Sequence, residues 1–174
     1  MANIVTCTIE FGSTEDKKRV LDATRGNETE FDFEIILPSP SDLKGPDLRS
    51  WREENWGTSR YSIVDTAGSV DIILDAVWSA PVGVFKALIE KNPDIEFAIS
   101  WVDEENTFGG SIYAPGDGTA KIIEFDCPDP YEELDEESFE DEDEYYFACE
   151  DFVGDFFRSP ECDARIAENA KKLL

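Results

Sequence analysis

The sequence contains no histidine, and this absence removes the side chain that most often serves as a general base. It also lacks a Gly-rich phosphate loop, a nucleophile elbow and an EF-hand loop. The turn Asp103-Glu-Glu-Asn106 offers ligands for a divalent ion, but hairpin turns favour Asp and Asn for backbone reasons. We therefore expect a protein that is not an enzyme and that needs neither a cofactor nor a metal.

Closely spaced cysteines and long apolar runs are absent as well. The four cysteines, at positions 7, 127, 149 and 162, form no Cys-x-x-Cys pair, so each is expected to act as a small buried or half-buried hydrophobe. No apolar run reaches the roughly 18–20 residues that span a bilayer, and the first residues carry no basic signal-peptide region. The sequence predicts a cytoplasmic protein, within a host cell, that makes no membrane contact.

Basic residues are scarce: 15 Lys and Arg stand against 41 Asp and Glu, for a formal charge of −26. Such a chain is repelled by nucleic acid and anionic membranes and is attracted to basic surfaces. Three explanations remain open, namely plain solubility, a halophilic host, and imitation of a polyanion. In each case direct binding of nucleic acid is not expected.

Periodicity predicts one α+β domain in the first part of the chain. Alternating apolar residues indicate strands at residues 3–11, 31–37, 70–78, 95–102, 108–113 and 120–125. Helices are expected from a cap at Ser13 or Thr14 to about residue 24, and from a Ser79 cap to Asn92. Residues 42–69 form a long connection with a helical turn near 48–54. This order predicts a ferredoxin-like antiparallel sheet with helices packed on one face.

The composition changes after Pro128. Residues 131–144 hold ten acids and no base, followed by an aromatic-rich stretch, and Ser159-Pro160-Glu161 opens a terminal helix. The predicted organisation is therefore a ferredoxin-like domain at 1–127, an acidic extension at 128–158 and a C-terminal helix at 159–174.

Several motifs resemble one known family. They are Phe31-x-Phe-x-x-Ile-Leu-Pro-x-Pro, Trp51-Arg-Glu-Glu-Asn-Trp-Gly-Thr58 and Ala76-Val-Trp-Ser-Ala-Pro81. Together they are similar to the Api92-like family of phage and plasmid proteins, over about residues 1–125. The resemblance implies a ferredoxin-like domain and a mobile-element origin. That family has no agreed activity, so it implies no catalytic residue.

Two kinds of binding residue are suggested. Trp51, Arg52, Trp56 and Arg60 can form an aromatic and cationic platform for a nucleotide or another small ligand. In the structural interpretation, which we favour, Trp56 and Trp78 pack the long loop against the sheet.

The acidic segment is the second candidate, either as a solvating tail or as a mimic of DNA, which carries one charge per about 1.7 Å of axis. The predicted partner-binding carboxylates are Glu132, Glu133, Asp135, Glu136, Glu137, Glu140, Asp141, Glu142, Asp143 and Glu144. The leading hypothesis is a phage protein that binds and inhibits a basic, nucleic-acid-handling host protein such as a CRISPR or restriction component. The alternatives are a ligand-binding module that uses residues 51–61 and a dimeric structural protein. Whether the protein forms a homodimer is open.

Overall fold

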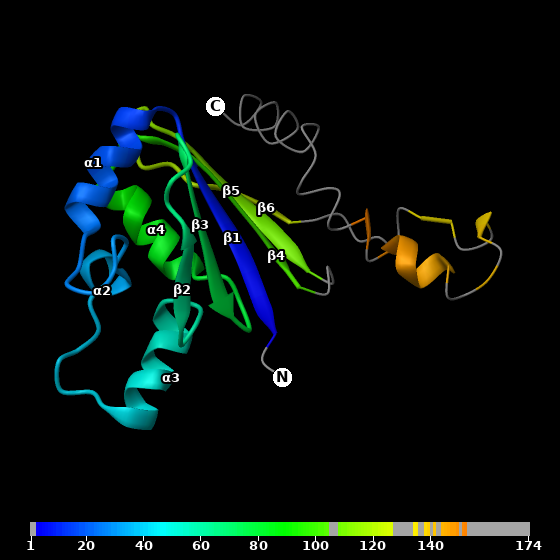
Figure 1. Cartoon of the computed structure of the whole chain (residues 1–174), viewed down its shortest axis with the longest axis horizontal. Helices are drawn as coiled ribbons and strands as arrows, with labels where there is room; N and C mark the ends of the chain where they lie inside the picture. Colours follow the sequence, from blue (N-terminus) through cyan, green and yellow to red (C-terminus); the bar gives the residue numbers. More distant parts are fainter. Residues whose placement is uncertain are drawn as a thin grey trace.

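The structure, a computed structural model, describes residues 3–104 and 108–126 and, further along, residues 134, 135, 138, 139, 141, 144–149, 151 and 152. Its centre is a six-stranded antiparallel sheet in the order β2-β3-β1-β4-β5-β6 (Figure 1). The strands are β1 Ile4–Phe11, β2 Tyr61–Asp65, β3 Asp71–Val77, β4 Glu96–Asp103, β5 Gly109–Pro115 and β6 Ile123–Asp126. The helices are α1 Thr14–Thr24, α2 Phe33–Ile36, α3 Gly45–Asn55 and α4 Val82–Lys91. The predicted α+β class is confirmed.

The hydrophobic core lies between one face of the sheet and the helices α1 and α4, which Figure 1 shows on the same side. Burial alternates along the central strand β1, and its core-facing residues are Val5, Cys7, Ile9 and Phe11. Helix α4 buries the four residues that the sequence placed on one helical face, Val84, Phe85, Leu88 and Ile89. Burying one such side chain contributes about 1.5–3 kcal/mol, so this layer provides most of the driving force for folding.

The two helices that pack on the sheet begin in different ways. In α1 the hydroxyl of Ser13 accepts a hydrogen bond from Asp16 N at 3.1 Å, as the predicted cap requires. The predicted Ser79 cap of α4 is wrong, because the residue before α4 is Pro81 and no side chain caps that end. The Ser79 hydroxyl donates to the carbonyl of Gly57 instead, which joins the start of α4 to the end of α3.

Residues 31–37 form no strand, which corrects the prediction. Asp32 caps the short helix α2 by accepting from Glu34 N at 2.9 Å. Phe33 and Ile36 are buried, whereas Ile35 is 40% exposed. The apolar residues therefore follow helical spacing, and the apparent alternation of 31, 33 and 35 misled the prediction because a local cap decides the conformation.

The connection 42–69 contains more structure than expected. Helix α3, at Gly45–Asn55, replaces the single turn predicted near 48–54. Strand β2 was not predicted: three of its five residues are exposed, none is fully buried, and its sequence carries no strong alternation. Its pairing with β3 is interrupted by a bulge between Ile63 and Asp65, and it forms one edge of the sheet.

Part of the acidic extension is described. Residues 144–149 are helical, Tyr145 and Cys149 are buried, and the ring of Phe139 lies 5.5 Å from that of Tyr145. The burial of Tyr145 agrees with the expectation that the aromatic residues dock, whereas Tyr146 and Phe147, 47% and 67% exposed, do not follow it. The predicted terminal helix at 159–174 lies outside the described residues, as do residues 105 and 106 of the predicted turn.

Candidate functional site

Three of the four residues predicted to form a ligand platform come together at the end of α3. Trp56 is buried, and its Nε1 donates to the carbonyl of Leu37 at 2.8 Å. The ring of Trp51 meets it edge-on at 6.3 Å, and the guanidinium of Arg52 lies 4.5 Å from its centroid. Arg60 is exposed and does not line the same cleft. The platform is therefore incomplete, and Trp56 serves mainly as a core residue.

Arg52 is held in place from its other end by Glu34. Its Nη2 lies 2.6 Å from Glu34 Oε1, and Ser39 donates to the same carboxylate through both its backbone N and its hydroxyl, each at 2.8 Å. Partial burial alone would raise the pKa of Glu34, but the hydrogen bonds from Ser39 and Arg52 outweigh burial and lower that pKa below its ordinary 4.5. The Arg52–Glu34 pair thus links α3 to α2.

A shallow cleft of about 350 Å³ opens above these residues. It is lined by Asn27, Glu28, Thr29, Asp32, Glu34, Arg52, Trp56 and Tyr61. Arg52 is the only base in this lining, beside three carboxylates, so the cleft disfavours the phosphates of a nucleotide. The ring of Tyr61 stacks on Phe33 at 3.6 Å, and its raised pKa reflects burial. The aromatic rings of the cleft are therefore occupied by contacts within the protein.

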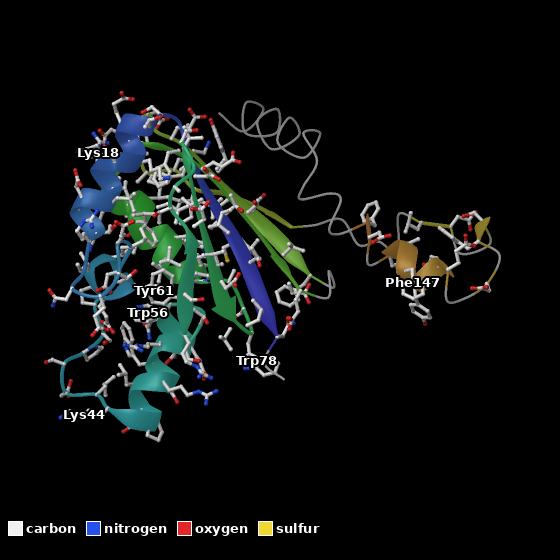
Figure 2. The ribbon with its side chains drawn as sticks, viewed as in Figure 1. Lys18, Lys44, Trp56, Tyr61, Trp78 and Phe147 are labelled. Carbon is white, nitrogen blue, oxygen red and sulfur yellow. The ribbon has the colours of Figure 1, made fainter. Side chains whose placement is uncertain are left out.

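The loop after α3 is closely packed, as the structural interpretation expected. Gly57 has φ +95°, and a Cβ there would meet the carbonyl oxygen of Ala80 at 2.5 Å. Gly83, in α4, donates its N–H to the carbonyl of Trp56 at 3.1 Å. The expected role of Trp78 in this packing is wrong, because its side chain is 53% exposed. Figure 2 shows Trp78 at the end of the sheet near the N-terminus, away from Trp56 and Tyr61.

The charged residues are segregated by element. The six strands contain eight Asp and Glu but no Lys or Arg. Across residues 1–126, 24 acids stand against 11 bases, and residues 127–174 hold a further 17 acids against four bases. Half of the net charge of −26 therefore belongs to the part of the chain that contains the sheet, and half to the remainder.

A second hollow, of about 200 Å³, lies between β1 and β4. Its lining residues are Thr6, Thr8, Ser100, Trp101, Val102, Asp103 and Glu104. Thr6 and Thr8 project from the face of the sheet opposite the core, where Thr6 donates to Asp75 at 2.9 Å and Thr8 pairs with Ser100. This hollow combines small polar residues with carboxylates and contains no base.

Three of the ten predicted partner-binding carboxylates are described, namely Asp135, Asp141 and Glu144, and all three are exposed. Asp141 Oδ1 accepts from Glu144 N at 2.8 Å, which caps the helix at 144–149. The other seven, Glu132, Glu133, Glu136, Glu137, Glu140, Glu142 and Asp143, lie outside the described residues. The described part of the segment is thus a capped, aromatic-anchored turn of helix with carboxylates on its surface.

Comparison with known proteins adds no identification. No family model matches the sequence, and no match was found among curated proteins or solved structures. Within the part of the chain that the structure describes, no helix has the length and apolar character needed to cross a membrane. The resemblance of residues 1–125 to the Api92-like family consequently stays a prediction.

Proposed function

We propose that this protein is a non-enzymatic binding protein that recognises a basic surface on a nucleic-acid-handling protein and competes there with nucleic acid. The observation that carries the proposal is the segregation of charge, with eight acids and no base in the six strands, although one of the eight, Asp103, is buried. Negative charge that is not balanced by bases attracts an oppositely charged partner and accelerates its association.

The bases of the sheet domain do little to offset this surface, because several are bound within the protein. Lys17 is buried and donates to the carbonyls of Thr66 and Gly68 at 2.7 and 2.5 Å. Lys91 donates to the carbonyls of Ile35 and Ile36, near the end of α2. Five further bases, Lys18, Arg19, Arg25, Arg49 and Arg52, form ion pairs with acids. Each ion pair also occupies a carboxylate, so the sign of the field around the molecule is set by the carboxylates in excess of the bases.

The acidic segment at 131–151 supplies the main contacts in this proposal. Its carboxylates are closely spaced in sequence, and the contact between Phe139 and Tyr145 gives part of the segment a defined shape. Closely spaced carboxylates on a folded segment can imitate the phosphates of DNA in a binding groove. The target class that fits is a host defence protein that grips DNA or RNA, such as a restriction or CRISPR component.

The origin of the scaffold is part of the same proposal. The strand order β2-β3-β1-β4, with α1 between β1 and β2 and α4 between β3 and β4, is the arrangement of a ferredoxin-like domain, to which β5 and β6 are added. This order supports the ferredoxin-like prediction and, with the motifs at 31–40, 51–58 and 76–81, a phage or plasmid origin in the Api92-like family.

The proposal is tested by capture of partners on the immobilised protein from a bacterial lysate. Captured proteins should bind nucleic acid and should be displaced by a short DNA duplex. They should also be released as salt rises from 50 to 500 mM, because the Debye screening length shortens to a few ångströms. Retention at 500 mM salt, or a ternary complex with DNA, would contradict the proposal. The alternative, a nucleotide-binding module, predicts micromolar binding of a common nucleotide that is lost on Arg52→Gln.

A further inference from the structure

The helix within the acidic segment has a packed side that its burial pattern defines. Residues 144–149 and 151–152 are helical. Tyr145 and Cys149 are buried, and Phe152 is half-buried. These three positions follow the spacing i, i+4 and i+7, so their side chains project from one side of the helix. The helix therefore packs through this side.

The other side of the helix carries an exposed ring between two exposed carboxylates. Phe147 (labelled in Figure 2) is 67% exposed, the largest exposed fraction among the large apolar side chains that the structure describes. Glu144 and Asp151, three residues before it and four residues after it, are also exposed. This spacing places all three on one face, away from Tyr145 and Cys149.

Tyr146 extends the aromatic surface beside Phe147. Its side chain is 47% exposed, so two consecutive rings are presented to solvent on a short helix. A segment that only solvates the protein gains nothing from exposed rings, because apolar surface in water is unfavourable. Aromatic residues are enriched in the contact regions of protein interfaces, and the pair is accounted for if a partner covers it.

The charge around the rings determines what kind of partner can approach. Residues 127–157 contain 14 Asp and Glu and no Lys or Arg. A second copy of the chain would bring the same charge to the contact and would be repelled, as would a nucleic acid. A basic surface is the complementary one. The occupant therefore combines positive charge with a place for an aromatic ring.

We propose that the face formed by Glu144, Phe147 and Asp151 docks in a groove that binds single-stranded nucleic acid, with the Phe147 ring in the position of a base. Such grooves hold the backbone with positive charge and stack successive bases on aromatic side chains. Proteins that bind duplexes contact phosphates and base edges, so they present no such stacking platform. The inference rests on the proposed function and narrows its partners to proteins that bind single strands.

The test uses the full chain, immobilised, and two protein pools as probes. One pool is what a bacterial lysate leaves on single-stranded-DNA cellulose, and the other is what it leaves on duplex-DNA cellulose. Retention of each pool is measured at about 150 mM salt, followed by displacement with oligo-dT. Phe147→Leu keeps the apolar character without the ring, and Phe147→Tyr keeps the ring. Val64→Ser is the matched control, because Val64 is 57% exposed and belongs to β2.

The parent chain should retain proteins from the single-strand pool. For Phe147→Leu, the oligo-dT concentration that displaces half of them should fall roughly fivefold to a hundredfold, because a stacking contact is lost. Phe147→Tyr and Val64→Ser should behave as the parent chain does. Equal retention by Phe147→Leu, an equal loss from both pools, or a loss matched by Val64→Ser would overturn the inference.

Thermal unfolding and sedimentation of each variant separate the other roles of Phe147. A lower unfolding temperature for Phe147→Leu would show a structural ring, and a dimer that this variant disperses would show that a second copy covers it. Either result overturns the inference. Retention from the duplex pool alone overturns it and leaves the proposed function standing. Retained proteins that neither oligo-dT nor duplex DNA displaces, or no retention from either pool, would contradict both proposals.

Discussion

Arg52 lies over Trp56, with 4.5 Å between the guanidinium carbon and the ring centroid. The stack covers a buried indole on the side of the cleft and continues through the ion pair with Glu34 into α2. Arg52→Ala should lower the free energy of unfolding by about 1–2 kcal/mol, from the lost stack and the partly buried pair. Urea unfolding followed by tryptophan fluorescence measures the change. Arg49→Ala, which removes an exposed pair with Glu53, is the control and should change stability little; equal effects would contradict this role of Arg52.

Glu34 makes stability depend on pH in a defined direction. Its pKa is lowered in the folded protein, so its contribution is fully present above the ordinary value of 4.5 and is lost as pH falls through the lower folded value. Glu34→Gln should therefore reduce the melting temperature at pH 7, and the difference from the parent chain should shrink near pH 3. Parallel melting curves at both pH values measure it. A melting-temperature difference that is the same at both pH values would show that Glu34 stabilises the fold through packing rather than through its charge.

Gly83 marks the closest approach of α4 to the end of α3. A Cβ at this position would lie 1.8 Å from the carbonyl oxygen of Asn55, so the two segments would have to separate. Gly83→Ala should destabilise the protein by about 1–3 kcal/mol, although alanine favours helix by up to 1 kcal/mol. Gly118→Asn is the control, because φ is +85° there but nothing lies within 4 Å. A Gly83→Ala protein as stable as the parent would show that α4 and the end of α3 can move apart without a cost in stability.

A chain that ends at Asp126 should retain the sheet. Among the residues that the structure describes, those of the main hydrophobic core, from Val5 to Ala114, precede this point. Circular dichroism should show strand and helix signals with a cooperative thermal transition. Loss of that transition would place residues 127–174 in the folding unit and would contradict the predicted boundary at 127.

Neutralising the acidic segment should affect binding more than folding. Changing Glu140, Asp141, Glu142, Asp143 and Glu144 to Gln or Asn should slow association with a basic partner, since long-range attraction acts on the on-rate. The melting temperature should stay the same or rise, because solvated carboxylates of like charge repel one another. Stopped-flow association across a salt series measures the first effect. An unfolded variant would instead show that these carboxylates are structural.

Strong periodicity made part of the fold predictable from the sequence. β1 and β3 alternate cleanly because one face of each packs on helices, and α4 carries four apolar residues on one face with Asn92 at its end. The interpretation that Trp56 packs its loop against the sheet was also reached from the sequence, and the burial of its side chain agrees with it.

The predictions that were wrong or missing concern features that depend on contacts between segments distant in the sequence. The helical state of residues 33–36 follows from a cap at Asp32 and from packing on Tyr61, 28 residues away from Phe33. β2 escaped prediction because its pairing with β3, not its own pattern, defines it. The exposure of Trp78 was missed because alternation along the strand assigns its side chain to the core. The positive φ of Trp78, which accompanies its departure from this alternation, cannot be predicted from the residue types. An aromatic residue directly after a strand, followed by Ser-Ala-Pro, was the available signal.

The bulge in β2 bears on self-association of the sheet. An edge strand with a regular row of free N–H and C=O groups is a template on which a second chain can add. In β2 the pairing register breaks between Ile63 and Asp65, within a strand that spans only the five residues Tyr61–Asp65. An incoming strand would meet a short, bulged edge that ends with the carboxylate of Asp65, so β2 is a poor template for the addition of a second chain.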